Sequence, residues 1–381
     1  MKTALLATEQ LITVKSIVLH RVRVPLVEPF RISNGSIAEK EAILIEVLSG
    51  DGHVGWGEAS PMTGSFYSGD TPESVWNSLT TSLIPEVLNA GEIDVSHFYE
   101  LLRAQGVDSF AKAGIEGALR DICARKNDVS LNTLLGGRTR PIPSGVAIGI
   151  YDDIGELLER VERYTAQGYR RVKIKIEPGW DVKPVTEIRS RFPELSLMVD
   201  ANAAYSLTDL AMFQELDTHG LMMIEQPLAR NAYEEAGELQ RRLRTPLCAD
   251  ESADSLEALG SLIEHKAARI INIKVQRVGG LSEAILMLNS ARAAGLECWV
   301  GTMPELGIAS AQGLHFATMD GFSCPTDIEA SMRWYVDDVI DPLIEIDELG
   351  YIHLPEGPGL GYRVVREKVE RYAMARAEFT N

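Results

Sequence analysis

Cysteines and long apolar runs are scarce in this sequence, and each scarcity restricts the class of protein. The four cysteines are widely separated, so no C-x-x-C pair indicates a zinc or redox motif, and free thiols fit a reducing compartment. No apolar run reaches the roughly 18 residues of a membrane helix. Polar residues interrupt Met1–Ile12, which makes a poor signal peptide. We therefore expect a cytoplasmic protein that does not enter membranes.

Positive charge is also scarce. There are 37 Lys and Arg residues against 55 Asp and Glu residues, which gives a formal net charge of −18. This balance disfavours nucleic acid and anionic membrane surfaces as partners, because both require a basic face. It leaves an anionic small molecule open, since a bound metal and clustered lysines can reverse the local field. Hydrophobic residues make up 45% of the chain, which supports a full core and argues against disorder.

The first part of the chain has the pattern of an α+β domain. Residues 14–24 and 41–48 alternate apolar and polar positions, as half-buried strands do. Asp51-Gly52 then indicates a hairpin turn before a short strand at 54–56. Helical patterns follow at 72–89, 94–104 and 109–126. We predict that residues 1–140 form a capping domain, because strands followed by helices favour a separate α+β unit.

The pattern changes after residue 141, where short apolar runs alternate with amphipathic helical stretches. The predicted strands are 145–150, 171–176, 195–200, 221–226, 246–250, 270–275, 297–302 and 322–326. The predicted helices are 152–167, 181–192, 206–217, 231–243, 253–265, 280–294 and 305–318. This alternation predicts a parallel sheet with helical crossovers, closed into a modified TIM barrel of the (β/α)7β type over residues 141–349. An open doubly wound sheet is the alternative.

The last segment, residues 350–381, has a sequence pattern that differs from those of the two preceding parts. It contains the turn-rich stretch Pro355–Gly361, which must form a loop. We predict that this segment packs back against the N-terminal cap.

Three predicted barrel strands end in acid. Asp200, Glu225 and Asp250 follow one another at intervals of 25 residues, about the length of one βα unit, which places them at the carboxyl ends of adjacent strands, where barrel enzymes keep their active sites. Converging carboxylates need a counter-charge, and hard oxygen ligands suit Mg²⁺, with Mn²⁺ as an alternative. Zinc is disfavoured because no His or Cys joins the set. The structural alternative is that each acid caps a helix or forms an ion pair.

Lysines alternate with apolar residues on two further predicted strands. Lys173 and Lys175 are two residues apart, so they share one face of a strand, and the interleaved residues Val172, Ile174 and Ile176 should face the helices. Asn272 and Lys274 repeat this pattern four strands later. We therefore expect the lysines to point into the barrel, with Lys175 opposite Lys274. Ion pairs with the three acids are the structural alternative.

These parts together suggest a reaction. A substrate carboxylate binds the metal, one lysine removes the α-proton, and the resulting enediolate is stabilised by nearby positive charge. A neutral lysine acts as a base only if its pKa falls toward neutrality, and neighbouring cations have that effect. The opposite lysine then returns a proton or stabilises the developing charge.

Several motifs resemble those of the muconate-lactonizing subgroup of the enolase superfamily over nearly the whole chain. The matching stretches are Lys173–Asp181, Asp200–Tyr205, Ile224–Pro227, Asp250–Ser252, Asn272–Lys274 followed by Arg277–Gly280, and Gly357–Gly361. The resemblance implies that Asp200, Glu225 and Asp250 bind the metal. It also implies that Lys175 and Lys274 are the acid/base pair and that Lys173 is their electrostatic partner. Asn202 and Glu251 resemble supporting residues.

The resemblance further implies that two cap loops, Glu28–Gly35 and Met62–Ser68, close over the substrate. Phe30, Arg31 and Tyr67 on these loops are therefore candidates for substrate contact. Plain surface turns are the alternative interpretation of both loops.

Within the subgroup, the run Lys175–Val182 and the position of Arg277 most resemble the o-succinylbenzoate synthase and N-succinylamino acid racemase family. The chain departs from that family at Val275-Gln276, where Pro-Gly is common, at Thr302-Met303, where Gly-Met is usual, at Ala147, where Ser is frequent, and at Pro325–Ala330 on the eighth strand. We therefore name Ala147, Arg277, Thr302, Met303 and Asp327 as further candidates for substrate contact. The departures affect the substrate more than the chemistry.

The expected activity is thus racemisation of an N-acylamino acid, dehydration to o-succinylbenzoate, or both. Racemisation needs a lysine on each face of the substrate, whereas the dehydration needs only one. Asp327-Ile328-Glu329 is an imperfect match to the acidic pair of dipeptide epimerases, so epimerisation of another amino-acid derivative stays open, as does muconate-type cycloisomerisation. A barrel that binds metal and carboxylates without catalysis is the alternative of another class. We also expect a homo-oligomer.

Overall fold

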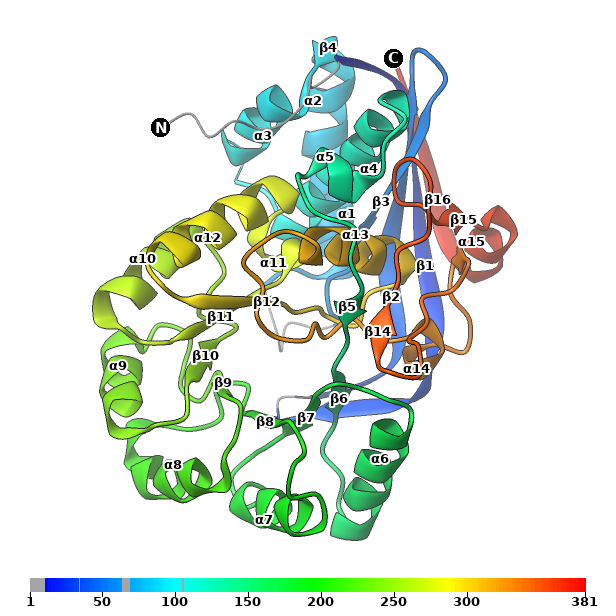
Figure 1. Cartoon of the computed structure of the whole chain (residues 1–381). Helices are drawn as coiled ribbons and strands as arrows, with labels where there is room; N and C mark the ends of the chain where they lie inside the picture. Colours follow the sequence, from blue (N-terminus) through cyan, green and yellow to red (C-terminus); the bar gives the residue numbers. More distant parts are fainter. Residues whose placement is uncertain (1–10, 34, 64–68, 105) are drawn as a thin grey trace.

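The structure is a computed structural model that describes residues 11–33, 35–63, 69–104 and 106–381. It contains a cap built on an antiparallel sheet and a barrel built on a curved parallel sheet (Figure 1). This arrangement confirms the predicted modified TIM barrel with a capping domain, and it is not the open doubly wound alternative. The predicted domain boundaries stay a prediction.

The cap sheet combines both ends of the chain. Its strands have the order β16–β1–β2–β3, and β4 pairs with the start of β1. C-terminal β16 runs antiparallel to β1, with Ile17 opposite Phe379, so the C-terminal segment returns to the cap as predicted. The strands are β1 (Ile12–Ile32), β2 (Gly35–Ser49), β3 (Val54–Ala59), β4 (Glu92–Ile93) and β16 (Ala373–Thr380).

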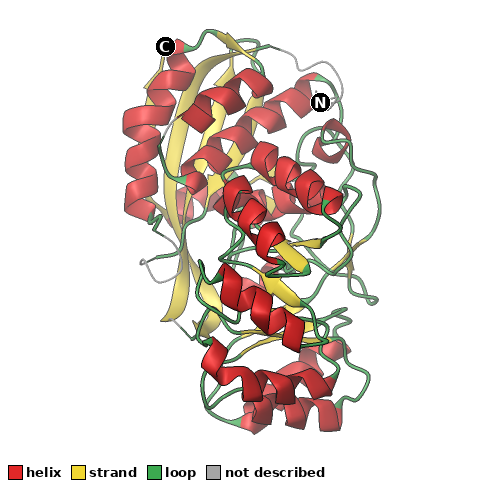
Figure 2. Cartoon of the chain, turned by 90° about the vertical axis from the view of Figure 1, so that its left-hand side faces the viewer, coloured by secondary structure: helices red, strands yellow, loops and turns green. Residues whose placement is uncertain are grey.

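Helices cover one side of this sheet (Figure 2). They are α1 (Pro72–Ser78), the π-helical turn η1 (Leu79–Leu83), α2 (Ile84–Asn89), α3 (Val95–Ala104), α4 (Ser109–Lys126) and α5 (Leu131–Leu134). Helix α4 packs against β3 at glycines: a Cβ on Gly57 would lie 1.9 Å from the carbonyl oxygen of Gly114. The helix and strand therefore approach more closely than any other residue at position 57 would permit.

The barrel sheet has the order β12–β11–β10–β9–β8–β7–β6, in which every neighbouring pair is parallel. Each strand lies inside a predicted apolar run. The strands are β6 (Val146–Ile148), β7 (Val172–Lys175), β8 (Leu197–Asp200), β9 (Ile224–Glu225), β10 (Leu247–Ala249), β11 (Ile270–Ile273) and β12 (Glu297–Val300).

The crossover helices surround these strands (Figure 1). They are α6 (Ile154–Ala166), α7 (Val182–Arg191), α8 (Leu210–Leu216) with short 3-10 turns η2 (Leu207–Asp209) and η3 (Asp217–His219), α9 (Tyr233–Arg242), α10 (Leu256–His265), α11 (Val275–Val278), α12 (Leu281–Ala293) and α13 (Gly307–Ala317). The remaining elements are β5 (Ile142–Pro143), α14 (Ser331–Trp334), β13 (Ile340–Asp341), β14 (Tyr351–Ile352), β15 (Arg363–Val364) and α15 (Arg366–Tyr372).

The predicted eighth strand, 322–326, is not a continuous strand. Phe322 and Thr326 make isolated parallel bridges to Cys298 and Ser144, so this segment joins β12 to the start of β6 without a regular ladder. Pro325 lies inside the segment and has no N–H to donate, which explains why the ladder is interrupted.

The prediction of a loop at Glu28–Gly35 is also wrong, because most of this segment is strand. Residues up to Ile32 belong to β1 and Gly35 begins β2, with Phe30 opposite Ile37 in the register. The two strands are long enough to leave the cap sheet and reach the barrel mouth as a hairpin arm (Figure 1). The alternation of Phe30 and Ile32 is a strand pattern that a loop assignment overlooked.

Cap and barrel share a hydrophobic core. One cluster of buried side chains includes Ile45 of the cap sheet, Ile115 of α4 and Ile273 of β11. A second cluster, around Ile174 and Val199, fills the space between β6–β9 and their helices. The shared cluster fixes the cap over one side of the barrel mouth. Among the described helices, none is long and apolar enough to cross a membrane.

We predict that Gly57→Ala lowers the free energy of unfolding by about 3 kcal/mol, because the added methyl group meets backbone atoms of α4 that cannot move independently. The matched control is Gly260→Ala on α10, where a Cβ meets nothing within 4 Å, and helix propensity should raise stability by about 0.5–1 kcal/mol. Chemical denaturation measures both changes. Equal stability of the two variants would contradict the close packing of α4 on β3.

Candidate active site

Three carboxylates meet at the carboxyl ends of adjacent barrel strands. Asp200 ends β8 and lies opposite Glu225, which ends β9, and Asp250 directly follows β10. All three are buried, and each offers an oxygen atom within 4.8 Å of the others. The parallel register therefore brings together the three acids whose equal spacing was apparent in the sequence.

The lysines of β7 point into the barrel as predicted. Val172, Ile174 and Ile176 pack in the core beneath the helices, so Lys173 and Lys175 face the opposite way. The ammonium of Lys175 donates to the carboxylate of Asp200 and, at 2.9 Å, to the side-chain oxygen of Asn202. Lys175 also lies opposite Asp200 in the strand register, so this contact follows directly from the pairing of β7 with β8.

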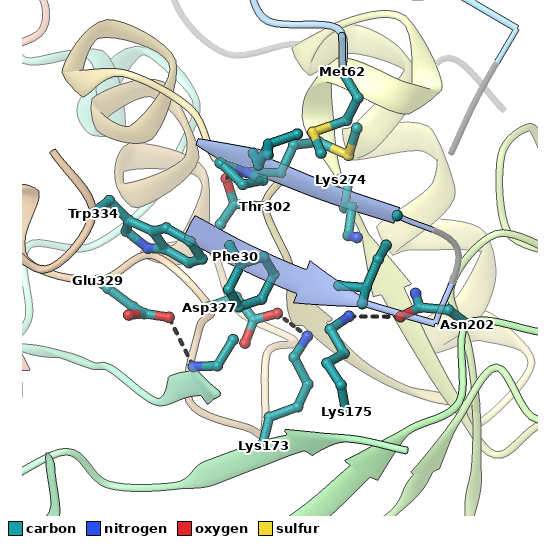
Figure 3. Close-up of a pocket in the computed structure, with 16 residues that line it drawn as sticks. Phe30, Met62, Lys173, Lys175, Asn202, Lys274, Thr302, Asp327, Glu329 and Trp334 are labelled. Carbon is teal, nitrogen blue, oxygen red and sulfur yellow. Dashed lines mark hydrogen bonds and ion pairs between the residues drawn. The ribbon is translucent and has the colours of Figure 1, made fainter. Parts of the chain in front are cut away.

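Lys274 approaches from the other side of the barrel, four strands along the sheet order (Figure 3). It directly follows β11 and is the N-cap residue of the one-turn helix α11. Its ammonium donates to Asp250 at 2.9 Å. Lys175 and Lys274 are therefore each held by a different carboxylate of the triad.

Lys173 lies between the acids. Its ammonium donates to Glu225 at 3.2 Å and to Asp327, and it lies 5.2 Å from the ring centroid of Trp299. Burial alone would lower the pKa of Lys173, but Asp327, Glu225 and Asp200 together raise it well above its ordinary value. Lys173 therefore stays protonated and acts as a fixed positive charge rather than as a base.

The triad carries crowded negative charge. Burial and then the neighbouring Asp200 raise the pKa of Glu225 to about 8, whereas Arg277 and Lys274 outweigh burial and lower the pKa of Asp250. Asn272 donates to Glu225 at 2.6 Å, but its own side-chain oxygen has no hydrogen-bond partner. Three buried carboxylates this close together fit a hard divalent cation, whose charge would relieve their repulsion.

A cavity lies between the barrel mouth and the cap (Figure 3), next to the lysines that contact the triad. The barrel supplies its polar end, where Lys173, Lys175, Lys274 and Asn202 line the wall. The apolar end has contributions from both domains: Phe30, Ile32, Gly35, Ile37, Met62, Ala147, Met303, Pro304 and Trp334. The rings of Phe30 and Trp334 meet edge to face, with centroids 4.8 Å apart.

Most of the predicted substrate-contact residues line this cavity. Phe30, Ala147, Thr302, Met303 and Asp327 all belong to its wall. Tyr67 lies outside the described residues. Asn202 lines the cavity, and its amide donates to Glu251 at 3.0 Å.

Two arginine candidates do not line the cavity. Arg31 turns outward and forms exposed ion pairs with Asp152 and Glu177. Arg277 is buried behind the triad, where it pairs with Asp250 and donates to the carbonyl oxygen of Asn272 at 2.8 Å. It therefore supports the acids and is not one of the residues that line the cavity.

Two wall residues have roles that sequence analysis missed. Trp334 comes from α14, beyond the eighth strand, and no period or motif pointed to it. Glu329 appeared only as part of an acidic pair. One of its oxygens accepts from the N–H of Ala147 at 2.8 Å, and the other lies 3.3 Å from the guanidinium of Arg333. The apolar end of the cavity thus contains one buried carboxyl group.

Comparison with known families agrees with this geometry. Residues 156–369 match the enolase C-terminal domain-like family, and residues 14–136 match the N-terminal domain of the mandelate racemase / muconate lactonizing enzyme family. The first match covers most of the barrel, after β6, and the second covers the N-terminal part of the cap.

Individual relatives span nearly the whole chain. The chain is 40% identical to an o-succinylbenzoate synthase from Geobacillus kaustophilus over 95% of its own length and 96% of the relative's. It is 38% identical to an N-succinylamino acid racemase from an Amycolatopsis species, over 94% and 98% of the two lengths. A crystal structure of an enolase-superfamily member from Listeria innocua superposes with a TM-score of 0.92, at 31% identity, over 97% and 99% of the two chains.

The structure combines a triad of strand-end acids, lysines on opposite strands and a cap that completes the cavity. Family models match both the cap and the barrel. The chain is therefore an enzyme that belongs to the enolase superfamily.

Proposed function

We propose that this enzyme abstracts a proton next to a carboxylate in a Mg²⁺-dependent reaction that passes through an enediolate. The single observation that carries the proposal is that the lysines Lys175 and Lys274 enter one cavity from strands four apart, directly above three buried acids. A binding protein has no need for a basic side chain on each side of its ligand, so the arrangement favours catalysis over binding alone.

Asp200, Glu225 and Asp250 would hold the divalent cation. Hard oxygen ligands without His or Cys favour Mg²⁺, with Mn²⁺ as the alternative. When bound, the cation supplies Lewis-acid stabilisation for negative charge that develops on the substrate carboxylate. Asn202 and Glu251 orient the polar end of the site, because Asn202 connects Lys175 to Glu251 through its side-chain amide.

Two of the three lysines in the cavity wall divide the proton transfers. Lys175 and Lys274 reach the substrate from opposite sides, so one removes the α-proton and the other can deliver a proton to the opposite face. Lys173 remains protonated beside Glu225 and Asp327. Its fixed charge lies on the same strand face as Lys175 and stabilises the enediolate.

For the substrate, we propose an N-acylamino acid such as an N-succinylamino acid, the precursor of o-succinylbenzoate, or both. An o-succinylbenzoate synthase and an N-succinylamino acid racemase both match nearly the whole chain. Racemisation uses both lysines, whereas the dehydration can use one lysine that removes the proton and then protonates the departing hydroxyl. The apolar cavity wall around Phe30 and Trp334 fits an aromatic or aliphatic group attached near the α-carbon.

A second candidate substrate is an aminoacyl-amino acid. The lysines of the cavity wall lie at its polar end, and its two wall acids are Asp327 and Glu329. A free amino group on the acyl part of the substrate could form an ion pair with Glu329. A second carboxylate on the substrate would not be attracted by Glu329.

A substrate comparison separates these candidates. We expect turnover with N-acylamino acids or with the synthase substrate under Mg²⁺, followed by NMR. If dipeptides alone react, the second candidate is correct. If neither turnover nor incorporation of deuterium at the α-carbon occurs in D₂O with any of these carboxylates, the protein binds and does not catalyse.

Replacing Lys175 or Lys274 should stop racemisation. We predict that Lys175→Ala and Lys274→Ala each lower the rate by about 10²–10⁴-fold, the usual contribution of a general acid or base. Polarimetry with an N-acylamino acid measures this change. The matched control is Lys183→Ala on the exposed side of α7, which should retain full activity. Near-normal racemisation by either cavity variant would refute the assignment of two bases.

Neutralising one acid should weaken metal binding. Glu225→Gln keeps the shape of the side chain but removes a charged ligand, so we expect the Kd for Mg²⁺ to rise by about 10–100-fold, equivalent to the loss of one charge-assisted contact. Isothermal titration calorimetry measures the Kd directly. Glu297→Gln at the exposed start of β12 is the control. Unchanged affinity in Glu225→Gln would place the metal elsewhere.

A further inference from the structure

Gln276 connects the cap to the turn that carries Lys274. It is the second residue of α11 and is buried. Its side-chain oxygen accepts from the N–H of Ser60 at 3.1 Å, and its side-chain nitrogen donates to the carbonyl oxygen of Glu58 at 2.8 Å. One barrel side chain thus forms hydrogen bonds to two backbone groups at the end of cap strand β3, as the backbone of a neighbouring strand would.

The cap side of this contact is rigid. The carboxylate of Glu58 accepts from the N–H groups of Leu306 and Ala309 at 2.7 and 2.9 Å, at the start of α13. The buried ammonium of Lys40 donates to the carbonyl oxygens of Ser60 and Pro61, at 2.8 Å each. The segment that Gln276 contacts is therefore held on both sides, and it leads within two residues to Met62 in the cavity wall.

The barrel side of the turn has its own anchor. Arg277, next to Gln276, pairs with Asp250 and donates to the carbonyl oxygens of Asn272 and Ala253. Lys274 donates to the same Asp250. The single turn of α11 is therefore held between the triad acids and the cap. On the cap side it packs against α4, and Gln276 adds two buried hydrogen bonds to the end of β3.

Lys175 is positioned differently. It is the last residue of β7, where the register with β8 sets it opposite Asp200. The cap contacts a residue near it, because Arg31 donates to Glu177 at 3.1 Å, but that ion pair is exposed and such pairs contribute little. Position 276 and position 177 each follow a cavity lysine by two residues, yet only the contact at 276 is buried.

We propose that Gln276 is a positioning residue that links the docking of the cap to Lys274, so that it controls proton transfer on the Lys274 face of the substrate and leaves the Lys175 face largely independent. This inference rests on the proposed two-lysine mechanism. A lysine in a strand keeps its place through the sheet, whereas a lysine at the start of a one-turn helix depends on whatever holds that turn.

The test is α-deuterium incorporation into each enantiomer of N-succinylphenylalanine, in D₂O with Mg²⁺, followed by NMR. Lys175→Ala and Lys274→Ala first identify which enantiomer gives its proton to which lysine. We then expect Gln276→Met, which keeps the volume but removes both hydrogen bonds, to slow exchange of the Lys274 enantiomer by about 10–100-fold, the scale of a small misplacement. Exchange of the Lys175 enantiomer should stay within about twofold, below the scale of such a misplacement.

Two further variants complete the design. Glu177→Ala removes the exposed cap contact near Lys175 and should leave both exchange rates unchanged. Gln276→Glu keeps the acceptor for Ser60 but loses the donor to Glu58. It should give a smaller loss confined to the same enantiomer, and it serves as the decisive variant if Gln276→Met does not fold.

The outcomes separate this inference from the proposed function. Equal losses for both enantiomers, or no loss for either, would overturn the role of Gln276, provided that the lysine variants divide the enantiomers. If wild-type enzyme exchanges neither enantiomer, the proposed function fails for N-acylamino acids and the role of Gln276 fails with it.

Discussion

The rest of the structure depends on the compensation of three buried carboxylates. Asp200, Glu225 and Asp250 lie too close together to carry full charge without partners, and an unpaired buried ion costs several kcal/mol. The compensating cations come from the strands and turns that surround them: Lys173 and Lys175 from β7, and Lys274 beside α11. The same arrangement that neutralises the acids therefore also places lysines at the barrel mouth, so the electrostatic requirement for folding and the geometry proposed for catalysis coincide.

The cap completes what the barrel cannot supply. A barrel mouth lined by lysines and acids is polar, and its apolar walls come largely from Phe30 and Met62 of the cap and from Trp334 beyond the eighth strand. The shared hydrophobic core and the buried bonds of Glu58 to α13 fix the cap at this place. In the proposed mechanism, substrate selection and proton transfer thus lie on different parts of the chain, an arrangement that lets one fold keep its proton chemistry while the substrate changes.

The sequence predicted the parts that follow from periodic patterns. Equal spacing located Asp200, Glu225 and Asp250, and alternation predicted the direction of Lys173, because both depend on strand geometry alone. The resemblance, rather than spacing, supplied their roles. Prediction failed at the eighth strand, at the arm around Phe30 and at Arg31. Local signals existed for the first two, because Pro325 cannot donate to a ladder and Phe30 alternates with Ile32 as in a strand. No local pattern indicates the direction of Arg31, which depends on acids distant in sequence.

Lys175 and Lys274 are chemically alike, but different structural elements hold them in place. This difference affects the proposed reactions unequally. Racemisation requires that Lys175 and Lys274 both reach the α-carbon in every catalytic cycle, so the rate is limited by the less well positioned of the two. The dehydration requires only one of them at a time and tolerates displacement of the other as long as its charge remains near the enediolate. A chain that holds Lys175 through strand register and Lys274 through a turn bonded to the cap is therefore more easily altered in its racemase activity than in a synthase activity that uses Lys175. Under the proposed mechanism, the contact between cap and α11 is thus the place where the balance between these two reactions can change without any change in the triad of acids.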